Sequence, residues 1–260
     1  MLIEGTKVAF LSLVGFAALL VVMVQRSRAG KFWGIRRLPA LDALGQAVGR
    51  AAESSTPIVF SAGAAKLTSG VDAPQILAGM AVLRHLCRLA GELKVKVLTT
   101  ARFAEFIAML EATMKSGYLE GGNPEVFNAE TDVSYLGAEG VAFHIGTMGL
   151  IARTKPAATV FVGAFACEAV MLAEASASVG ALQISGTARI VSMPFLISTA
   201  DYYLIGEEVY AASAYVSKDP AQAATLGVTD IGKLVTVALI VIGLIASAAG
   251  SKALTQILSR

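Results

Sequence analysis

Cysteine and histidine, the residues that form disulfides and hold structural zinc, are scarce in this chain. Its 260 residues include two cysteines, Cys87 and Cys167, and two histidines, His85 and His144. A structural zinc site needs several convergent Cys or His ligands, and a disulfide framework needs more than one isolated pair. The cysteines are far apart in sequence, and the histidines fall in separate predicted helices. We therefore expect no metal site and no bound cofactor, and we expect both thiols to be reduced and buried.

Charged residues are also few. They make up 15% of the chain and give a formal net charge of +2, whereas about 25% charged residues is usual in soluble domains. A net charge this small is not the strongly basic balance of a nucleic-acid-binding protein, so we expect no nucleic-acid partner. The basic residues instead gather at 26–37, directly after an apolar run, where anionic lipid headgroups attract them.

Two charge-free apolar runs, 8–24 and 234–250, lie near the ends of a chain that is 55% hydrophobic. Each run has about 17 residues, the lower end of what crosses a bilayer as a helix. We expect two transmembrane anchors, in segments 1–25 and 233–260, around one domain at 26–232, so the lipid bilayer is an expected partner. A cleaved signal peptide is the alternative for the first run, but there the basic residues follow the apolar stretch instead of preceding it.

The flanking charges predict the side of the membrane. Basic residues follow the first run, and Lys233 immediately precedes the second. By the positive-inside rule the domain is cytoplasmic, and both termini lie on the opposite side.

Small residues recur where helices are expected to pack. Gly243 with Ser247, and Ala246 with Gly250, form two small-xxx-small pairs in the second run, and segment 164–180 is rich in Ala, Ser and Gly. Such surfaces let helices approach closely. We expect a homo-oligomer, and packing of the second span against the chain's own first span is the alternative.

Between the runs, short apolar segments alternate with segments of helical periodicity. Strands are predicted at 57–61, 95–99, 133–136, 159–162, 182–185 and 202–205, and helices at 41–54, 72–91, 103–117, 138–152, 165–179, 193–199 and 207–217. Asp72 is expected to cap the second of these helices, with Pro74 in its first turn. Alternating strands and helices imply parallel pairing with crossover connections. The sequence therefore predicts a Rossmann-like three-layer α/β sandwich with a mostly parallel sheet.

Candidate ligand-binding residues follow the predicted strand ends, because ligands of such sheets bind at the carboxyl edge. The loop 61–70 carries glycines but lacks the spacing of a phosphate-binding loop. Cys167, whose thiol a helix N-terminus would activate, is more simply a buried structural residue, and Glu207 and Glu208 are more simply acids at a helix start. No catalytic residue is identified. The candidates for ligand contact are Ser61, Gly63, Gly163, Cys167, Glu168, Gly186, Thr187, Arg189 and Glu207.

Three segments carry a family resemblance. Segments 41–51, 178–187 and 201–215, with Ile205-Gly-Glu-Glu as the most specific piece, resemble an uncharacterised family of prokaryotic membrane-anchored proteins that is known as a domain of unknown function. The resemblance covers 38–245. It implies an anchored α/β architecture and assigns no functional residue.

Three functions remain open on these observations. The favoured one is a membrane-tethered, non-catalytic scaffold or assembly protein whose cytoplasmic domain self-associates or docks a protein partner in the membrane or cytoplasm. The second is a sensor that binds a small anionic or nucleotide-like ligand at the carboxyl edge of the sheet. The third is a membrane-associated enzyme that uses Cys167 or one of the carboxylates Glu168, Asp201, Glu207 and Glu208.

Overall fold

The chain folds into two compact units. The computed structural model describes residues 7–29, 37–167 and 169–248. One unit is an α/β unit, Arg36–Ser217, and the other is a helical unit made of Met1–Ile35 and Lys218–Arg260.

A six-stranded, fully parallel sheet forms the centre of the α/β unit, in the order β3-β2-β1-β4-β5-β6. Its strands are β1 (Ile58–Gly63), β2 (Val97–Ala101), β3 (Val133–Tyr135), β4 (Ala158–Ala164), β5 (Leu182–Thr187) and β6 (Tyr202–Ile205). This is the doubly wound Rossmann order, in which the connections reverse direction between β1 and β4. The predicted parallel α/β fold is confirmed.

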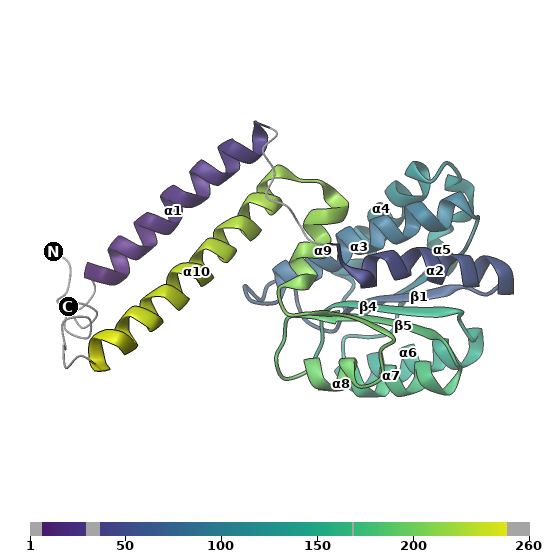
Figure 1. Cartoon of the computed structure of the whole chain (residues 1–260). Helices are drawn as coiled ribbons and strands as arrows, with labels where there is room; N and C mark the ends of the chain where they lie inside the picture. Colours follow the sequence, from purple (N-terminus) through teal and green to yellow (C-terminus); the bar gives the residue numbers. More distant parts are fainter. Residues whose placement is uncertain (1–6, 30–36, 168, 249–260) are drawn as a thin grey trace. The chain divides into compact units, whose positions relative to one another are not determined.

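Helices cover both faces of this sheet, as Figure 1 shows: α2, α3, α4 and α9 lie on one face, and α6, α7 and α8 lie on the other. The helices of the α/β unit are α2 (Pro39–Ser54), α3 (Ala73–Glu92), α4 (Glu105–Glu120), α5 (Ala129–Asp132), α6 (Gly140–Thr154), α7 (Ala169–Ser178), α8 (Met193–Ile197) and α9 (Glu208–Ser217), with a 3-10 turn η1 at Pro124–Val126.

The two faces of the sheet bury different side chains. Alternate strand residues such as Phe60 and Val160 join the large core under α2, α3, α4 and α9. The residues between them, such as Val59 and Phe161, pack with Leu172 of α7 in a smaller core. This two-sided burial explains why the strands read as short continuous apolar runs.

Most predicted elements begin or end a few residues away from the predicted bounds, and two of the differences have a clear physical reason. The helix expected to stop at Gly117 continues to Glu120, because Gly117 is not a terminating residue but the point where α4 touches α3. The strand expected at 95–99 is Val97–Ala101, because the Val95 N–H still donates to the Ala90 carbonyl in the turn that ends α3. Pro74 does lie in the first turn of α3, but Asp72 makes no side-chain capping hydrogen bond there.

The helical unit pairs α1 (Lys7–Arg28) with α10 (Pro220–Ala248). Met23 of α1 packs in one cluster with Ala224 and Val228 of α10, and the Phe16 ring lies against Gly232, so the two helices run antiparallel. Segments Phe10–Arg28 and Pro220–Ile245 are both long and apolar enough to cross a membrane. Packing of the second apolar helix against the first is thus confirmed.

Both small-xxx-small pairs of the second apolar run include residues outside the described part of the chain. The side chains of Ala246 and Ser247, and all of Gly250, lie outside the residues that the structure describes, as does the end of the predicted run 234–250.

Candidate ligand-binding cleft

The carboxyl ends of β1 and β4 meet at the point where the sheet reverses its winding. Gly63 pairs with Ala164 across a register shift, and the Ala64 N–H donates to the Ala164 carbonyl at 3.0 Å. A Cβ on Gly63 would lie 2.1 Å from the Ala164 oxygen, and one on Gly163 would lie 2.0 Å from the Ala62 oxygen. Both glycines are therefore required for the two strands to stay together to their ends, and the sheet opens only beyond them.

A cleft of about 350 Å³ begins there, at the carboxyl edge of the sheet. It is bounded by the loops that follow β1, β2, β4 and β5, and its lining residues are Ala64, Ala65, Lys66, Thr68, Ser69, Asp72, Arg102, Phe103, Ala164, Ala166 and Arg189. In open α/β sheets ligands bind in the crevice outside the carboxyl ends of the strands at this switch point.

An ion pair closes one side of the cleft. The Arg189 guanidinium donates to both carboxylate oxygens of Asp72, at 2.7 and 2.6 Å, and the Ser69 hydroxyl donates to the same carboxylate at 2.8 Å. The Asp72 side chain is only 7% exposed. The hydrogen bond from Arg189 outweighs burial and holds the pKa of the Asp72 carboxyl below its usual value. The pair ties the loop after β1 to the loop after β5.

Two further cations, Arg102 and Lys66, line the cleft near the end of β2. Arg102 donates to the carbonyls of Ala64 and Ala138, at 2.6 and 3.0 Å, and its guanidinium lies 5.0 Å from the centre of the Phe103 ring. The Lys66 ammonium lies 5.5 Å from the same ring. Cation–π contacts of this kind hold the charged groups beside an apolar surface. The lining thus combines three cations with one carboxylate and one aromatic ring.

Among the residues selected from the sequence, Arg189 lines the cleft and Thr187 supports it. The buried Thr187 hydroxyl accepts from the Arg189 N–H at 3.2 Å. Gly63 and Gly163 form the strand contact beside the cleft. Ser61 is not in a loop but is buried within β1, where its hydroxyl accepts from the Gly63 N–H.

The other selected residues lie elsewhere or have another role. Gly186 is inside β5 and packs against Leu204. Cys167 precedes α7 and is exposed, so its expected burial is wrong. Glu168 lies outside the described residues. Glu207 is exposed in the turn after β6, the outermost strand, two strands away from β4.

The carboxylates considered for catalysis do not gather at one edge. Asp201 precedes β6, and its carboxylate accepts from the Gln183 N–H at 2.8 Å near the amino end of β5. Glu207 and Glu208 follow the carboxyl end of β6. In the described part of the chain, no three His, Cys, Asp or Glu residues are grouped so as to hold a metal ion.

The candidates selected from the sequence did not include Lys66, Arg102 or Phe103, and Asp72 was expected only as a helix cap. Their position in the sequence could have identified Arg102 and Phe103, because both directly follow β2 and a parallel sheet brings the carboxyl ends of all its strands to one edge. Phe103 was instead assigned to the following helix because it fits the helical period of that helix.

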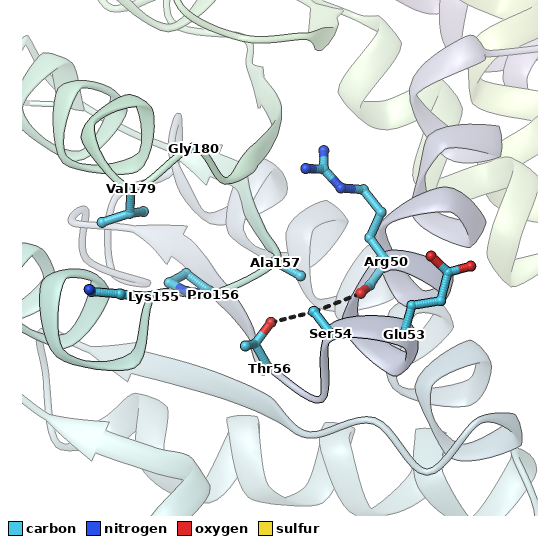
Figure 2. Close-up of a pocket in the computed structure, with 9 residues that line it drawn as sticks. All are labelled: Arg50, Glu53, Ser54, Thr56, Lys155, Pro156, Ala157, Val179 and Gly180. Atoms are coloured by element: carbon cyan, nitrogen blue, oxygen red, sulfur yellow. Dashed lines mark hydrogen bonds between the residues drawn. The ribbon is translucent and has the colours of Figure 1, made fainter.

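A second hollow, of about 470 Å³, lies at the opposite edge, beside the amino ends of β1, β4 and β5. Figure 2 shows that its charged groups diverge: the Arg50 guanidinium, the Glu53 carboxylate and the Lys155 ammonium point in different directions. The Ser54 hydroxyl is engaged locally, by the Arg50 carbonyl and by Thr56, at 2.7 Å each. This hollow offers no convergent set of groups for a ligand.

The strand order and the switch-point cleft define a doubly wound α/β protein of the Rossmann type, with one long apolar helix on each side of the α/β unit in sequence. The chain belongs to the family described as Domain of unknown function (DUF6754), whose model matches residues 2–258. The expected membership of an uncharacterised family is confirmed. Comparison with curated proteins finds no match, and comparison with solved structures finds none either.

Proposed function

We propose that this protein is a membrane-tethered binding module whose α/β unit takes a small anionic ligand in the switch-point cleft. The observation that carries the proposal is the convergence of Lys66, Arg102 and Arg189, from three different loops, on one cleft with a single carboxylate. Partly desolvated cations at the mouth of a cleft attract anions more strongly than cations dispersed over a surface.

The shape of the cleft restricts the ligand. Its volume is at the lower end of the range of about 300–1,000 Å³ for small-molecule sites. The Phe103 ring supplies an apolar wall, and Asp72 holds the Arg189 guanidinium in one orientation. These features suit a phosphate or carboxylate group attached to a compact planar or apolar portion. The loop after β1 has no phosphate-loop glycine spacing, so side-chain cations, not a row of backbone N–H groups, would hold the anion.

The membrane tether is the second part of the proposal. It is supported by the length and apolar character of α1 and α10, and by Arg26 and Arg28 at the end of α1. With these charges on the cytoplasmic side, the α/β unit is cytoplasmic and both termini lie across the bilayer.

The test measures binding of inorganic pyrophosphate and of AMP to the full chain in detergent, by isothermal titration calorimetry. Lys66→Gln removes one cation from the exposed rim of the cleft, and we expect at least one probe to bind about 5–10-fold more weakly, equivalent to about 1–1.4 kcal/mol. Arg50→Gln, in the hollow of Figure 2, is the matched control and should leave binding unchanged. Loss of binding in Arg50→Gln alone, or wild-type protein that binds neither probe at millimolar concentration, would overturn the proposal.

A scaffold function, with self-association or docking of a protein partner, is a second proposal. It is supported by the outer strand β6, where Tyr203 and Ile205 are 47% and 39% exposed on the sheet edge. Exposed apolar edge strands are frequent sites of protein association. A particle that has the mass of a monomer in several mild detergents would contradict this proposal.

A further inference from the structure

Two short turns at the carboxyl edge of the sheet have apolar tips. A backbone hydrogen bond of 3.2 Å closes the turn 69–72, directly before α3, and another of 3.2 Å closes the turn 189–192, directly before α8. Val71 lies at the tip of the first turn, and Ile190 and Val191 form the tip of the second. Turn tips are usually Gly, Pro, Asn, Asp or Ser, so three β-branched apolar residues at these positions need another explanation.

These three side chains are held together and are open to solvent. The side chains of Val71, Ile190 and Val191 are 76%, 82% and 68% exposed. The last residue of the first turn, Asp72, binds the first residue of the second turn, Arg189, through two hydrogen bonds. The ion pair thus joins the two tips into one surface, which we call the apolar rim. Exposed apolar side chains gathered in one place mark sites of contact with proteins or membranes.

The cleft beside the apolar rim is cationic. Asp72 neutralises Arg189, so Lys66 and Arg102 supply the net positive charge of the lining. A soluble anion would meet these cations and leave the rim in water. An anionic phospholipid carries a phosphate next to apolar chains, so it is complementary to the cleft and to the rim together.

The chain connection also favours a bilayer over a separate protein partner. Only residues 218 and 219 lie between α9 of the α/β unit and α10. With α10 in the bilayer, as the proposed function holds, the α/β unit stays within reach of the lipid surface. Contact with that surface is then effectively intramolecular, so a small apolar rim and one phosphate site are sufficient for it to form.

We propose that the cleft binds the headgroup phosphate of an anionic phospholipid, and that the apolar rim inserts into the bilayer beside it. This inference rests on the tether and the cleft of the proposed function, and it names the source of the anion. Lys66 and Arg102 attract the phosphate, while the rim enters the boundary between headgroups and acyl chains. The carboxyl edge of the sheet is thus the membrane-facing edge of the α/β unit.

The test locates the rim in lipid nanodiscs that hold the full chain. In a Cys167→Ser background, Val191→Cys carries an environment-sensitive fluorophore, and the buried Cys87 does not react. In nanodiscs that contain phosphatidylglycerol, we expect a blue shift of its emission and quenching by nitroxide groups on the acyl chains. Leu93→Cys is the matched control: Leu93 is apolar and 54% exposed, but it follows α3 at the opposite edge of the sheet, so its fluorophore should not be quenched.

Two further variants, each combined with the labelled Val191→Cys, test the two parts of the contact. Ile190→Ser removes an apolar side chain from the rim and should lower the ratio of docked to undocked molecules about tenfold. Lys66→Gln removes a cation from the cleft and should lower that ratio about fivefold. Both positions are exposed, so the fold should tolerate the changes. Arg50→Gln is the control and should leave the ratio unchanged. The inference is overturned if either Ile190→Ser or Lys66→Gln has no effect.

The other outcomes separate this inference from the proposed function. If the fluorophore of Val191→Cys stays in water while pyrophosphate or AMP binds the cleft, the inference is wrong and the proposed function stands. If the fluorophore stays in water and neither probe binds, both fail. A blue shift without nitroxide quenching means that protein covers the rim, and equal quenching in phosphatidylcholine alone means that no anionic headgroup is needed. Either result overturns the inference.

Discussion

The contact between α3 and α4 provides a stability prediction whose sign depends on a single methyl group. A Cβ added to Gly117 of α4 would lie 2.6 Å from the Arg84 carbonyl oxygen and 2.6 Å from the Cys87 Cβ of α3. Ordinary contacts between such atoms are about 3.5–4.0 Å, so the two helices would have to separate by about 1 Å. Because one of the obstructing atoms belongs to the backbone, no change of rotamer can relieve the overlap.

Two opposing terms give the magnitude for Gly117→Ala. Replacing Gly by Ala in a helix interior favours the helix by about 1 kcal/mol. Overpacking of a tight interior costs about 1–3 kcal/mol, and backbone overlap falls toward the upper end of that range. We expect Gly117→Ala to lower the free energy of unfolding by about 1–2 kcal/mol. Gly45→Ala in α2 is the matched control: no atom lies within 4 Å of its added Cβ, so it should raise stability by about 1 kcal/mol.

Cys87 reports both effects, because its thiol is fully buried in the folded chain and burial raises its pKa. In a Cys167→Ser background, labelling of Cys87 in urea requires unfolding, and 1.4 kcal/mol corresponds to a tenfold change in rate. Gly117→Ala should label about 5–30-fold faster than its parent and Gly45→Ala about fivefold slower. Thermal unfolding followed by circular dichroism should rank the variants in the same order. If Gly117→Ala proves as stable as Gly45→Ala, the close approach of α3 and α4 is not present in solution.

Three other properties are predicted. Tyr118→Phe removes a buried hydroxyl that donates to the Val95 carbonyl at 2.8 Å and accepts from the Val97 N–H at 2.9 Å, so the urea midpoint should fall by an amount equivalent to about 1–3 kcal/mol. The hydrogen bond from Arg189 lowers the pKa of the Asp72 carboxyl from 3.8, so the ionised carboxylate stabilises the fold above that pH, and this contribution is lost as the pH falls below it. In Asp72→Asn the urea midpoint should therefore depend less on pH between about pH 5 and pH 2, and an unchanged pH dependence would contradict this role. A cysteine at residue 3 should react with an impermeant reagent in intact cells and Asn123→Cys only after lysis, and the reverse pattern would exclude a cytoplasmic α/β unit.

Local sequence patterns were sufficient to predict the α/β class and the two long apolar helices. The short apolar runs such as Ile58–Gly63, and the helical spacing in Pro39–Ser54, are properties of neighbouring residues, so the chain displays them without its fold. The predicted end of α4 was wrong because it depends on contacts with residues far away in the sequence. Gly117 signals a helix end in sequence, but α4 continues through it because a glycine is what lets α4 lie against α3.

The candidate site and the helix register depended on tertiary structure. Only the order of the strands brings Arg102, which follows β2, and Arg189, which follows β5, to one cleft with Lys66. Likewise, only the packing of α1 on α10 places Gly232 beside Phe16. The physical reason is the same in both cases: hydrogen bonding between strands and packing between helices join residues far apart in the chain, and the local periodicity of each segment is compatible with many such pairings.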